Sequence, residues 1–214
     1  MNTITLYNTL PAVFAEREPV PSQVWRCEVS FERGRYYLVS AESGTGKSSL
    51  CSYLYGYRRD YEGVMRFDER DLRSLAVEQW CYVRKHELAY LPQDMKLFAE
   101  LTALENVELK NQLTAHKTRR EIEDFFERLD IADKLHCPVA KLSIGQQQRV
   151  ALIRALCQPA DFIVLDEPVS HLDEQRNHIA AAIVDEEARR MGAGVIATSV
   201  GNPLQLTYHS HLEL

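Results

Sequence analysis

The sequence predicts an α/β fold with a mostly parallel sheet, an antiparallel β subdomain and an inserted helical lobe. Three observations lead to this prediction. The apolar run at 36–39 passes through a glycine-bearing turn into a helical pattern that starts near residue 48. Continuous apolar runs at 162–165 and 194–197 are typical of parallel strands that are buried on both faces. Between residues 100 and 141 strand signals vanish and apolar residues recur at helical spacing.

The elements before residue 100 follow from short patterns. Residues 3–7 and 24–31 alternate as strands, and a glycine then turns the chain into the strand at 36–39. After the helix that follows, we expect a strand at 63–67, a helix within 74–86 and a strand at 87–91.

The helical lobe is expected at about 100–155. Within it, one segment has apolar residues at i, i+3, i+4 and i+7, namely Ile122, Phe125, Phe126 and Leu129. This spacing predicts an amphipathic helix whose apolar stripe packs inside the lobe. Beyond the lobe we expect a strand at 162–165, a helix from about 174 to 191, a strand at 194–197 and a last strand at 209–214.

The composition is that of an ordinary soluble protein, with 45% hydrophobic and 26% charged residues in 214. We expect one domain, 1–214. The net charge is −6 and basic runs are no longer than arginine pairs, so nucleic acid is a poor default partner. Five cysteines without CxxC spacing are typical of reduced thiols in the cytosol. No segment approaches 18 apolar residues, so we expect no membrane span in the chain itself.

Residues 41–48, Ala-Glu-Ser-Gly-Thr-Gly-Lys-Ser, form the turn between the strand at 36–39 and the next helix. Successive backbone N–H groups in such a turn point at an anion, and the helix N-terminus adds partial positive charge. We predict a phosphate-binding loop in which Lys47 reaches the terminal phosphates and the Ser48 hydroxyl ligates Mg²⁺. The nucleotide-binding residues assigned here are Ser43, Gly44, Thr45, Gly46, Lys47, Ser48 and Ser49.

An acidic pair, Asp166 and Glu167, follows the buried strand at 162–165. The carboxyl ends of parallel strands are where such sheets bind ligands. Asp166 can hold the Mg²⁺ shell, and Glu167 can orient or deprotonate an attacking water.

Residues 142–146, Leu-Ser-Ile-Gly-Gln, precede a good helical run at 147–156. Ser143 and Gly145 therefore stand at a helix N-terminus. A hydroxyl and free N–H groups there can bind phosphate from a second nucleotide site.

Five elements in this order resemble the nucleotide-binding subunit of an ATP-binding cassette (ABC) transporter, a P-loop NTPase, over essentially the whole chain. They are the end of the phosphate loop at 46–48, Gln93, the signature stretch 142–146, the acidic strand 161–167, and the Ser-His-Leu-Asp stretch 170–173. The resemblance implies ATP and Mg²⁺ as cofactors and Glu167, Gln93 and Lys47 as catalytic residues. It also implies that Gln93 touches Mg²⁺ and water and reports occupancy to a membrane partner.

The resemblance further implies that sites are shared across a dimer. The phosphate loop of one subunit then faces Ser143, Gly145 and Gln146 of the other, in a homodimer or heterodimer that closes on two ATP. Asp173 lies in the loop that communicates across this dimer, and Phe14 resembles the aromatic residue that stacks on adenine.

A separate transmembrane permease subunit is the implied partner, which places this chain in the cytoplasm, peripheral on the inner face of the cell membrane. The segments at 91–98 and 101–109 resemble the lipoprotein-releasing, macrolide-export and cell-division types. The transported substrate is set by the permease, so the sequence leaves it open, together with the choice between ATP and GTP.

Three positions depart from the family pattern. Ala41 and Ile144 stand where glycine is usual, and alanine is tolerable at 41 only if φ stays negative. Ser199 stands where the family has a histidine that contacts the γ-phosphate. Losing one pre-organised donor typically lowers the rate by about 10²–10³, so we expect slow hydrolysis. His209 and His211 lie too far along the chain to be assumed substitutes.

Two alternatives remain open. The chain is a soluble cassette ATPase of repair, translation or cluster assembly, or it is a weakly hydrolysing regulatory subunit that binds nucleotide. A short helical lobe and a single cassette argue against the first alternative, and the presence of Glu167 argues against the second.

Overall fold

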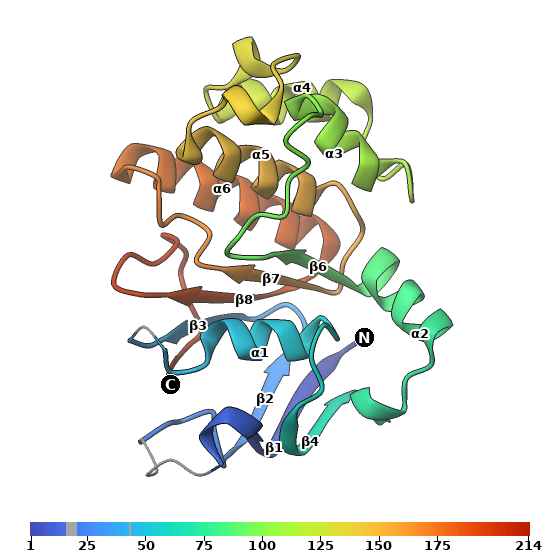
Figure 1. The fold of residues 1–214 in the computed structure, drawn as a ribbon, viewed down its shortest axis with the longest axis vertical. Helices are drawn as coiled ribbons and strands as arrows, with labels where there is room; N and C mark the ends of the chain where they lie inside the picture. Colours follow the sequence, from blue (N-terminus) through green and yellow to red (C-terminus); the bar gives the residue numbers. More distant parts are fainter. Residues whose placement is uncertain (16–20, 43) are drawn as a thin grey trace.

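The computed structural model describes residues 1–15, 21–42 and 44–214. A parallel sheet lies at mid-height in Figure 1. The first helix, α1 (Lys47–Leu54), and a separate antiparallel sheet lie on one side of it, and helices α3 to α6 lie on the other. The predicted P-loop NTPase architecture is therefore confirmed.

The larger sheet has the strand order β6-β7-β8-β3-β9, and all four neighbouring pairs are parallel. Its register places Asp166 opposite Thr198 and Ser40 opposite Ser199, so the carboxyl ends of three strands meet at one edge. The strands are β3 (Tyr36–Ser40), β6 (Leu88–Leu91), β7 (Phe162–Asp166), β8 (Gly194–Ser199) and β9 (Ser210–Glu213).

The smaller, antiparallel sheet has the order β2-β1-β4-β5. Its strands are β1 (Thr3–Pro11), β2 (Glu28–Glu32), β4 (Tyr61–Phe67) and β5 (Arg70–Asp71), with a 3₁₀ turn at Ala12–Phe14. The predicted strand at 24–31 was wrong in its first half. The Ser22 hydroxyl accepts the N–H groups of Val24 and Trp25, and Arg26 has a φ of 58°, so the chain turns before β2 begins.

The helix expected within 74–86 is shorter and irregular. A 3₁₀ turn (Leu72–Ser74) precedes α2 (Val77–Tyr82), and a π turn (Val83–Glu87) follows. The Asp71 carboxylate accepts the Arg73 N–H, which closes the first turn early.

Capping boxes start all three helices of the lobe: Thr102 with Glu105, Thr118 with Glu121, and Ser143 with Gln146. The helices are α3 (Ala103–Asn111), α4 (Arg119–Arg128) and α5 (Ile144–Leu156), with 3₁₀ turns at Ala132–Lys134 and Val139–Lys141. The predicted stripe of α4 is buried as expected. Helix α6 (Glu174–Met191) follows β7 and ends at Gly192, whose φ is 61°.

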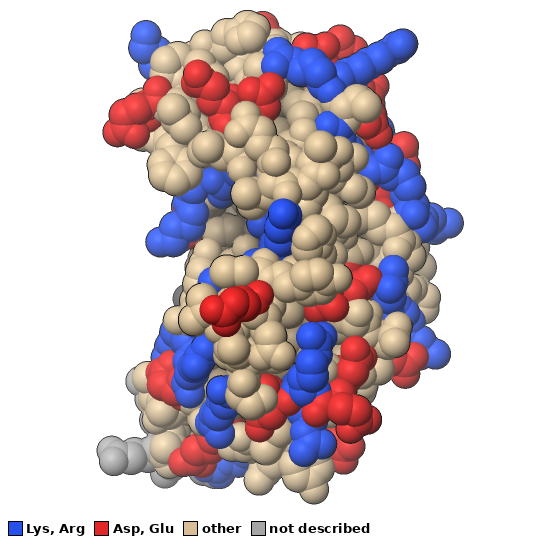
Figure 2. Space-filling model, turned by 90° about the vertical axis from the view of Figure 1, so that its right-hand side faces the viewer, with Lys and Arg blue, Asp and Glu red and all other residues tan. Residues whose placement is uncertain are grey.

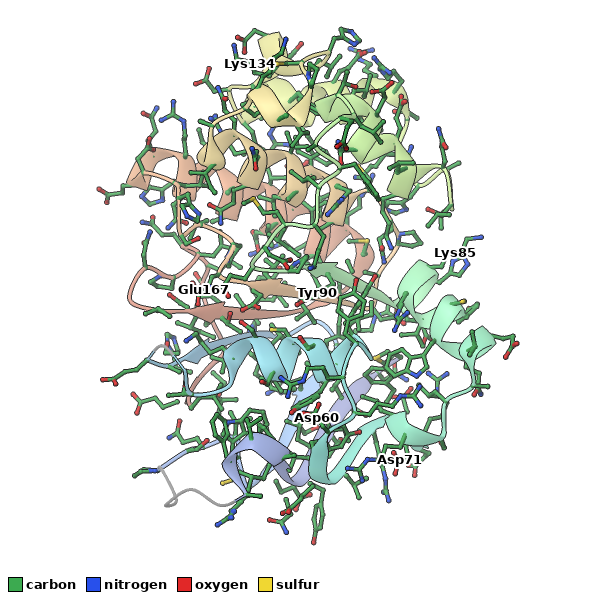
Figure 3. The ribbon with its side chains drawn as sticks, viewed as in Figure 1. Asp60, Asp71, Lys85, Tyr90, Lys134 and Glu167 are labelled. Atoms are coloured by element: carbon green, nitrogen blue, oxygen red, sulfur yellow. The ribbon has the colours of Figure 1, made fainter. Side chains whose placement is uncertain are left out.

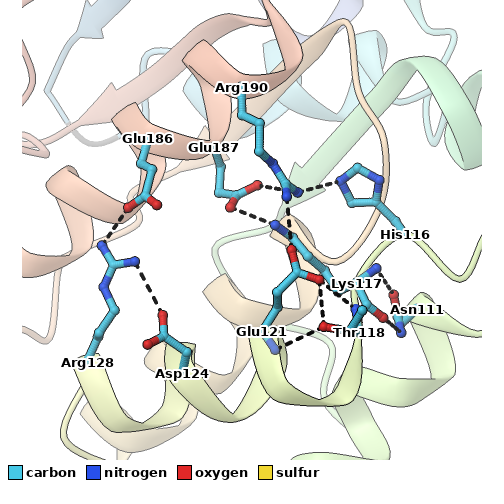
Figure 4. Close-up of polar contacts among 10 residues, drawn as sticks. All are labelled: Asn111, His116, Lys117, Thr118, Glu121, Asp124, Arg128, Glu186, Glu187 and Arg190. Carbon is cyan, nitrogen blue, oxygen red and sulfur yellow. Dashed lines mark hydrogen bonds and ion pairs between the residues drawn. The ribbon is translucent and has the colours of Figure 1, made fainter.

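Polar contacts join the lobe to α6 (Figure 4). Lys117, just before α4, places Nζ 2.6 Å from Oε1 of Glu187 on α6, and both side chains are almost fully buried. Arg190 contacts the other carboxylate oxygen of Glu187 and also Glu121 of α4. The lobe is therefore joined to α6 by ion pairs as well as by apolar packing.

On the face shown in Figure 2, Lys and Arg side chains are interspersed with Asp and Glu rather than gathered by sign. Among the helices of the described residues, none has the length and apolarity that crossing a membrane requires.

Candidate functional site

The phosphate loop joins β3 to α1, and its glycines adopt conformations that side chains disfavour. Gly44 has a φ of 87° and Gly46 a φ of 105°. A Cβ on Gly46 would lie 2.9 Å from the Phe14 ring, so the loop packs directly under that ring. The indole N–H of Trp25 donates to the Thr45 carbonyl at 3.0 Å, which ties the loop to the antiparallel subdomain.

Ala41 is accommodated without strain, because it is absent from the described residues with positive φ. The Lys47 side chain is 4% exposed and folds back onto the loop. It donates to the carbonyls of Ala41 at 3.2 Å and Glu42 at 2.8 Å, and it lies 3.9 Å from Oε1 of Glu167. The structure thus brings the predicted lysine and the predicted base together. Ser43 lies outside the described residues.

Thr198 on β8 positions both acidic residues at the end of β7. Its hydroxyl donates to Oδ1 of Asp166 at 2.7 Å and accepts the N–H of Glu167 at 3.1 Å. Burial raises the pKa of Asp166, while the hydrogen bond from Thr198 and the nearby Lys47 charge oppose that shift. In Figure 3, Glu167 lies where β7 ends, on the left of the sheet.

Glu167 has a left-handed backbone, with a φ of 51°. Such a conformation costs a non-glycine residue of the order of 1–3 kcal/mol unless its surroundings hold it. Gln148 of α5 stabilises this backbone conformation, because its Nε2 donates to the Glu167 carbonyl at 3.0 Å. Gln148 was not among the residues predicted from the sequence. The available signal was a glutamine three residues after Gly145, on the face of α5 that is otherwise apolar and buried.

Ser48, Gln93 and Asp166, the three predicted Mg²⁺ ligands, line one pocket of about 270 Å³. The Ser48 hydroxyl donates to Oε1 of Gln93 at 3.2 Å. A hydroxyl, an amide oxygen and a carboxylate are hard oxygen donors, which fit Mg²⁺ and leave room for the waters that it keeps. Across the described residues, no group of three or more His, Cys, Asp or Glu side chains offers a rival metal site.

The signature residues lie elsewhere. Ser143 caps α5: its N–H donates to Oε1 of Gln146 at 2.9 Å, and its hydroxyl accepts the Gln146 N–H at 3.3 Å. Helices α5 and α1 lie on opposite sides of the parallel sheet (Figure 1). Within one chain the structure therefore separates Ser143, Gly145 and Gln146 from the phosphate loop.

Among the described residues, the side chains of three other predicted site residues form no hydrogen bond with the phosphate loop or the acidic pair. Asp173 is exposed and caps α6 by accepting the Arg176 N–H at 2.9 Å. The Ser49 hydroxyl accepts from Arg58 at 2.9 Å. Ser199 is 2% exposed, and its buried hydroxyl has no hydrogen-bond partner in the part of the chain that the structure describes.

The model of the ABC transporter family matches residues 25–170, which include the phosphate loop, Gln93, the signature stretch and the acidic pair. This chain belongs to the ABC transporter family. The resemblance inferred from the ordered motifs is confirmed.

Named relatives agree with this. An uncharacterised ABC transporter ATP-binding protein of Thermotoga maritima is 35% identical over 150 residues, which are 68% of this chain and 64% of that protein. The lipoprotein-releasing system ATP-binding protein LolD 1 of Chlorobium chlorochromatii is 27% identical over 175 residues, 80% of this chain and 71% of that protein. The alignments span 51 to 64% of the length of the first three curated relatives.

The dimeric structure of the bacterial ABC transporter cassette MJ0796 has a TM-score of 0.78 and 23% sequence identity, and the match covers 92% of this chain and 87% of that chain. At this identity the likeness concerns the fold. It confirms the α/β cassette architecture that the sequence predicts.

Proposed function

We propose that this chain is the ATP-binding and ATP-hydrolysing subunit of an ABC transporter and that it powers a separate membrane-spanning partner. One observation carries the proposal. Lys47, Ser48, Gln93, Asp166 and Glu167 come from three separate segments, yet they meet at the carboxyl edge of the parallel sheet. Family membership and an ABC transporter ATP-binding relative support the same role.

In this proposal the loop N–H groups hold the ATP phosphates, and Phe14 lies against the loop on the side where adenine stacks. Lys47 exchanges the Ala41 and Glu42 carbonyls for phosphate oxygens. Ser48, Gln93 and Asp166 would hold Mg²⁺, which supplies charge neutralisation on the phosphates. Glu167, fixed by Thr198 and Gln148, orients or deprotonates the attacking water.

A second copy or a related cassette would complete each site, because Ser143, Gly145 and Gln146 lie away from the phosphate loop of their own chain. The bacterial ABC transporter cassette MJ0796, whose fold this chain shares, has a dimeric structure. An isologous arrangement places both signature stretches over both loops at once.

A groove beside Gln93 supports a separate permease as partner. This pocket of about 310 Å³ is lined by Tyr90, Lys110 and Arg154, among others, and it shares Tyr90 with the pocket that contains Gln93. Burial and the nearby guanidinium groups of Arg154 and Arg84 lower the pKa of Lys110 to about 8. None of these three cations forms an ion pair with a described residue, so the groove suits an acidic segment from outside the chain. Such docking places the chain on the inner face of the membrane.

We also propose that hydrolysis is slow. At position 199 the hydroxyl is buried, so it offers the γ-phosphate no donor in this conformation. One missing donor corresponds to a loss of about 10²–10³ in rate.

The test is MgATP hydrolysis by the purified chain beside Glu167→Gln and Ser199→His, with dimer formation followed by light scattering. We expect measurable turnover that Glu167→Gln abolishes, an ATP-dependent dimer, and faster turnover in Ser199→His. ATP-dependent dimers that hydrolyse only after Ser199→His would instead identify a regulatory subunit. Native turnover that is unaffected by Glu167→Gln would refute the proposed site.

A further inference from the structure

The site has no imidazole at position 199. Two histidines that could replace it, His209 and His211, already contact tyrosines of their own chain. His209 accepts the Tyr36 N–H through Nδ1 at 2.9 Å and packs edge-on against the Tyr36 ring. His211 lies on β9, and its ring packs against that of Tyr208, which precedes the strand. Neither ring is positioned to reach the carboxyl edge where Glu167 lies.

His171 is different, because it is exposed and follows Glu167 by four residues. Its carbonyl lies 2.8 Å from where a Cβ on Gly145 would stand. The loop that carries His171 and the start of α5 therefore form one continuous surface. If Gly145 faces the nucleotide of a second subunit, as the proposed function requires, His171 faces it as well.

The loop is held in place by Gln148, which is 3% exposed. Nε2 of Gln148 donates to Oγ of Ser170 at 3.1 Å, and Oε1 accepts the His171 N–H at 2.9 Å. The same amide binds the Glu167 carbonyl. One side chain of the signature helix thus fixes the base and the imidazole relative to each other.

The Ser170 hydroxyl also lies 3.0 Å from Nδ1 of His171. Because this oxygen accepts from Gln148, its own proton is available for Nδ1. When the hydroxyl donates to Nδ1, the ring proton is on Nε2. In that tautomer the exposed His171 has an N–H donor that its own loop does not use.

We propose that His171 supplies, across the dimer interface, the imidazole donor that position 199 lacks. This inference rests on the proposed function. Nε2–H of one subunit donates a hydrogen bond to a γ-phosphate oxygen of the ATP held by the phosphate loop of the other. Water attacks phosphorus and gives its proton to Glu167, and the bond from phosphorus to the β-phosphate oxygen breaks, which releases ADP and phosphate. His171 keeps its own proton and stabilises the charge that develops. The hydrolysis that the chain retains depends on this donor.

The first test compares the MgATP turnover of the native chain, His171→Ala and His171→Ala/Ser199→His. We expect His171→Ala to lower kcat by about 10²-fold or more, and Ser199→His to restore it. His178→Ala is the matched control, because His178 is exposed on α6 and lines a different pocket. ATP-dependent dimer formation shows that each variant folds and binds.

The second test separates action across the interface from action within one chain. Glu167→Gln and His171→Ala are each inactive alone, but a mixed dimer contains one site with both Glu167 and His171 only if His171 acts on the other subunit's site. An equimolar mixture then recovers about a quarter of native turnover, because half of the dimers are mixed and each has one complete site. No recovery overturns action across the interface.

The outcomes distinguish this inference from the proposed function. A native chain that hydrolyses MgATP through Glu167 while His171→Ala retains native kcat refutes the role of His171 alone. A native chain that shows no hydrolysis refutes both.

Discussion

Replacing Gln148 by leucine removes the side chain that holds the left-handed Glu167. The amide makes three hydrogen bonds, two as donor and one as acceptor. At about 1 kcal/mol each, their loss lowers the free energy of unfolding by about 3 kcal/mol. For a chain of this size that corresponds to a fall in melting temperature of about 6–12 °C. Glu167 also loses its register with the phosphate loop, and a displacement of the base by about 1 Å lowers kcat by about 10²-fold.

Urea unfolding measures the first effect, and steady-state MgATP hydrolysis at saturating ATP measures the second. Gln147→Leu is the control, because Gln147 donates only to the carbonyls of Val139 and Leu142 among described residues and makes no contact with Glu167. We expect Gln147→Leu to affect stability while kcat stays near native. Equal kcat for the native chain and Gln148→Leu would refute the reasoning, whatever happens to stability.

Three further predictions follow from other contacts. Lys117→Met leaves the buried Glu187 with Arg190 as its one ion-pair partner among the described residues. It should lower the free energy of unfolding, measured in urea, by about 3 kcal/mol, and the Lys117→Met/Glu187→Leu double variant should regain most of that loss. Gly46→Ala should weaken ATP binding, measured by titration calorimetry, more than Gly44→Ala does. The methyl group added at Gly46 would lie 2.9 Å from the Phe14 ring, whereas a methyl group at Gly44 would meet no atom within 4 Å. The pKa of Asp166 is raised in the folded state. The protonated carboxyl therefore contributes its full stabilisation below the pKa of about 4 that an unfolded aspartate has, and this stabilisation is lost as pH rises through the pKa of the folded state. Asp166→Asn should therefore raise the melting temperature at pH 7, and the advantage should disappear at acidic pH; an equal shift at both pH values would contradict this.

Much of the fold was predictable because its strands have strong local signatures. The runs at 162–165 and 194–197 are apolar at every position, since both faces of the parallel sheet are covered, and they became β7 and β8. The carboxyl-edge rule then placed Asp166 and Glu167 beside the phosphate loop. The ordered motifs identified the family before any contact was known.

The features that were not predicted depend on contacts between residues that are not neighbours in the sequence pattern. The early strand failed because Ser22 turns the backbone at Val24, which alternation alone does not reveal. The Gln148 side chain joins α5 to the Glu167 backbone, about twenty residues further along the chain. The Ser199 hydroxyl is buried because β8 lies between β7 and β3 in the sheet, and the order of strands is not visible in the residues around position 199.

The indole of Trp25 provides an intrinsic optical probe of the phosphate loop. The chain has two tryptophans. Trp80 packs against Phe67 in the antiparallel subdomain, whereas Trp25 donates to Thr45 inside the loop itself. When the loop reorders around a ligand, the environment of Trp25 changes while that of Trp80 stays the same. Fluorescence of a Trp80→Phe variant therefore follows occupancy of this loop in real time, without a labelled nucleotide.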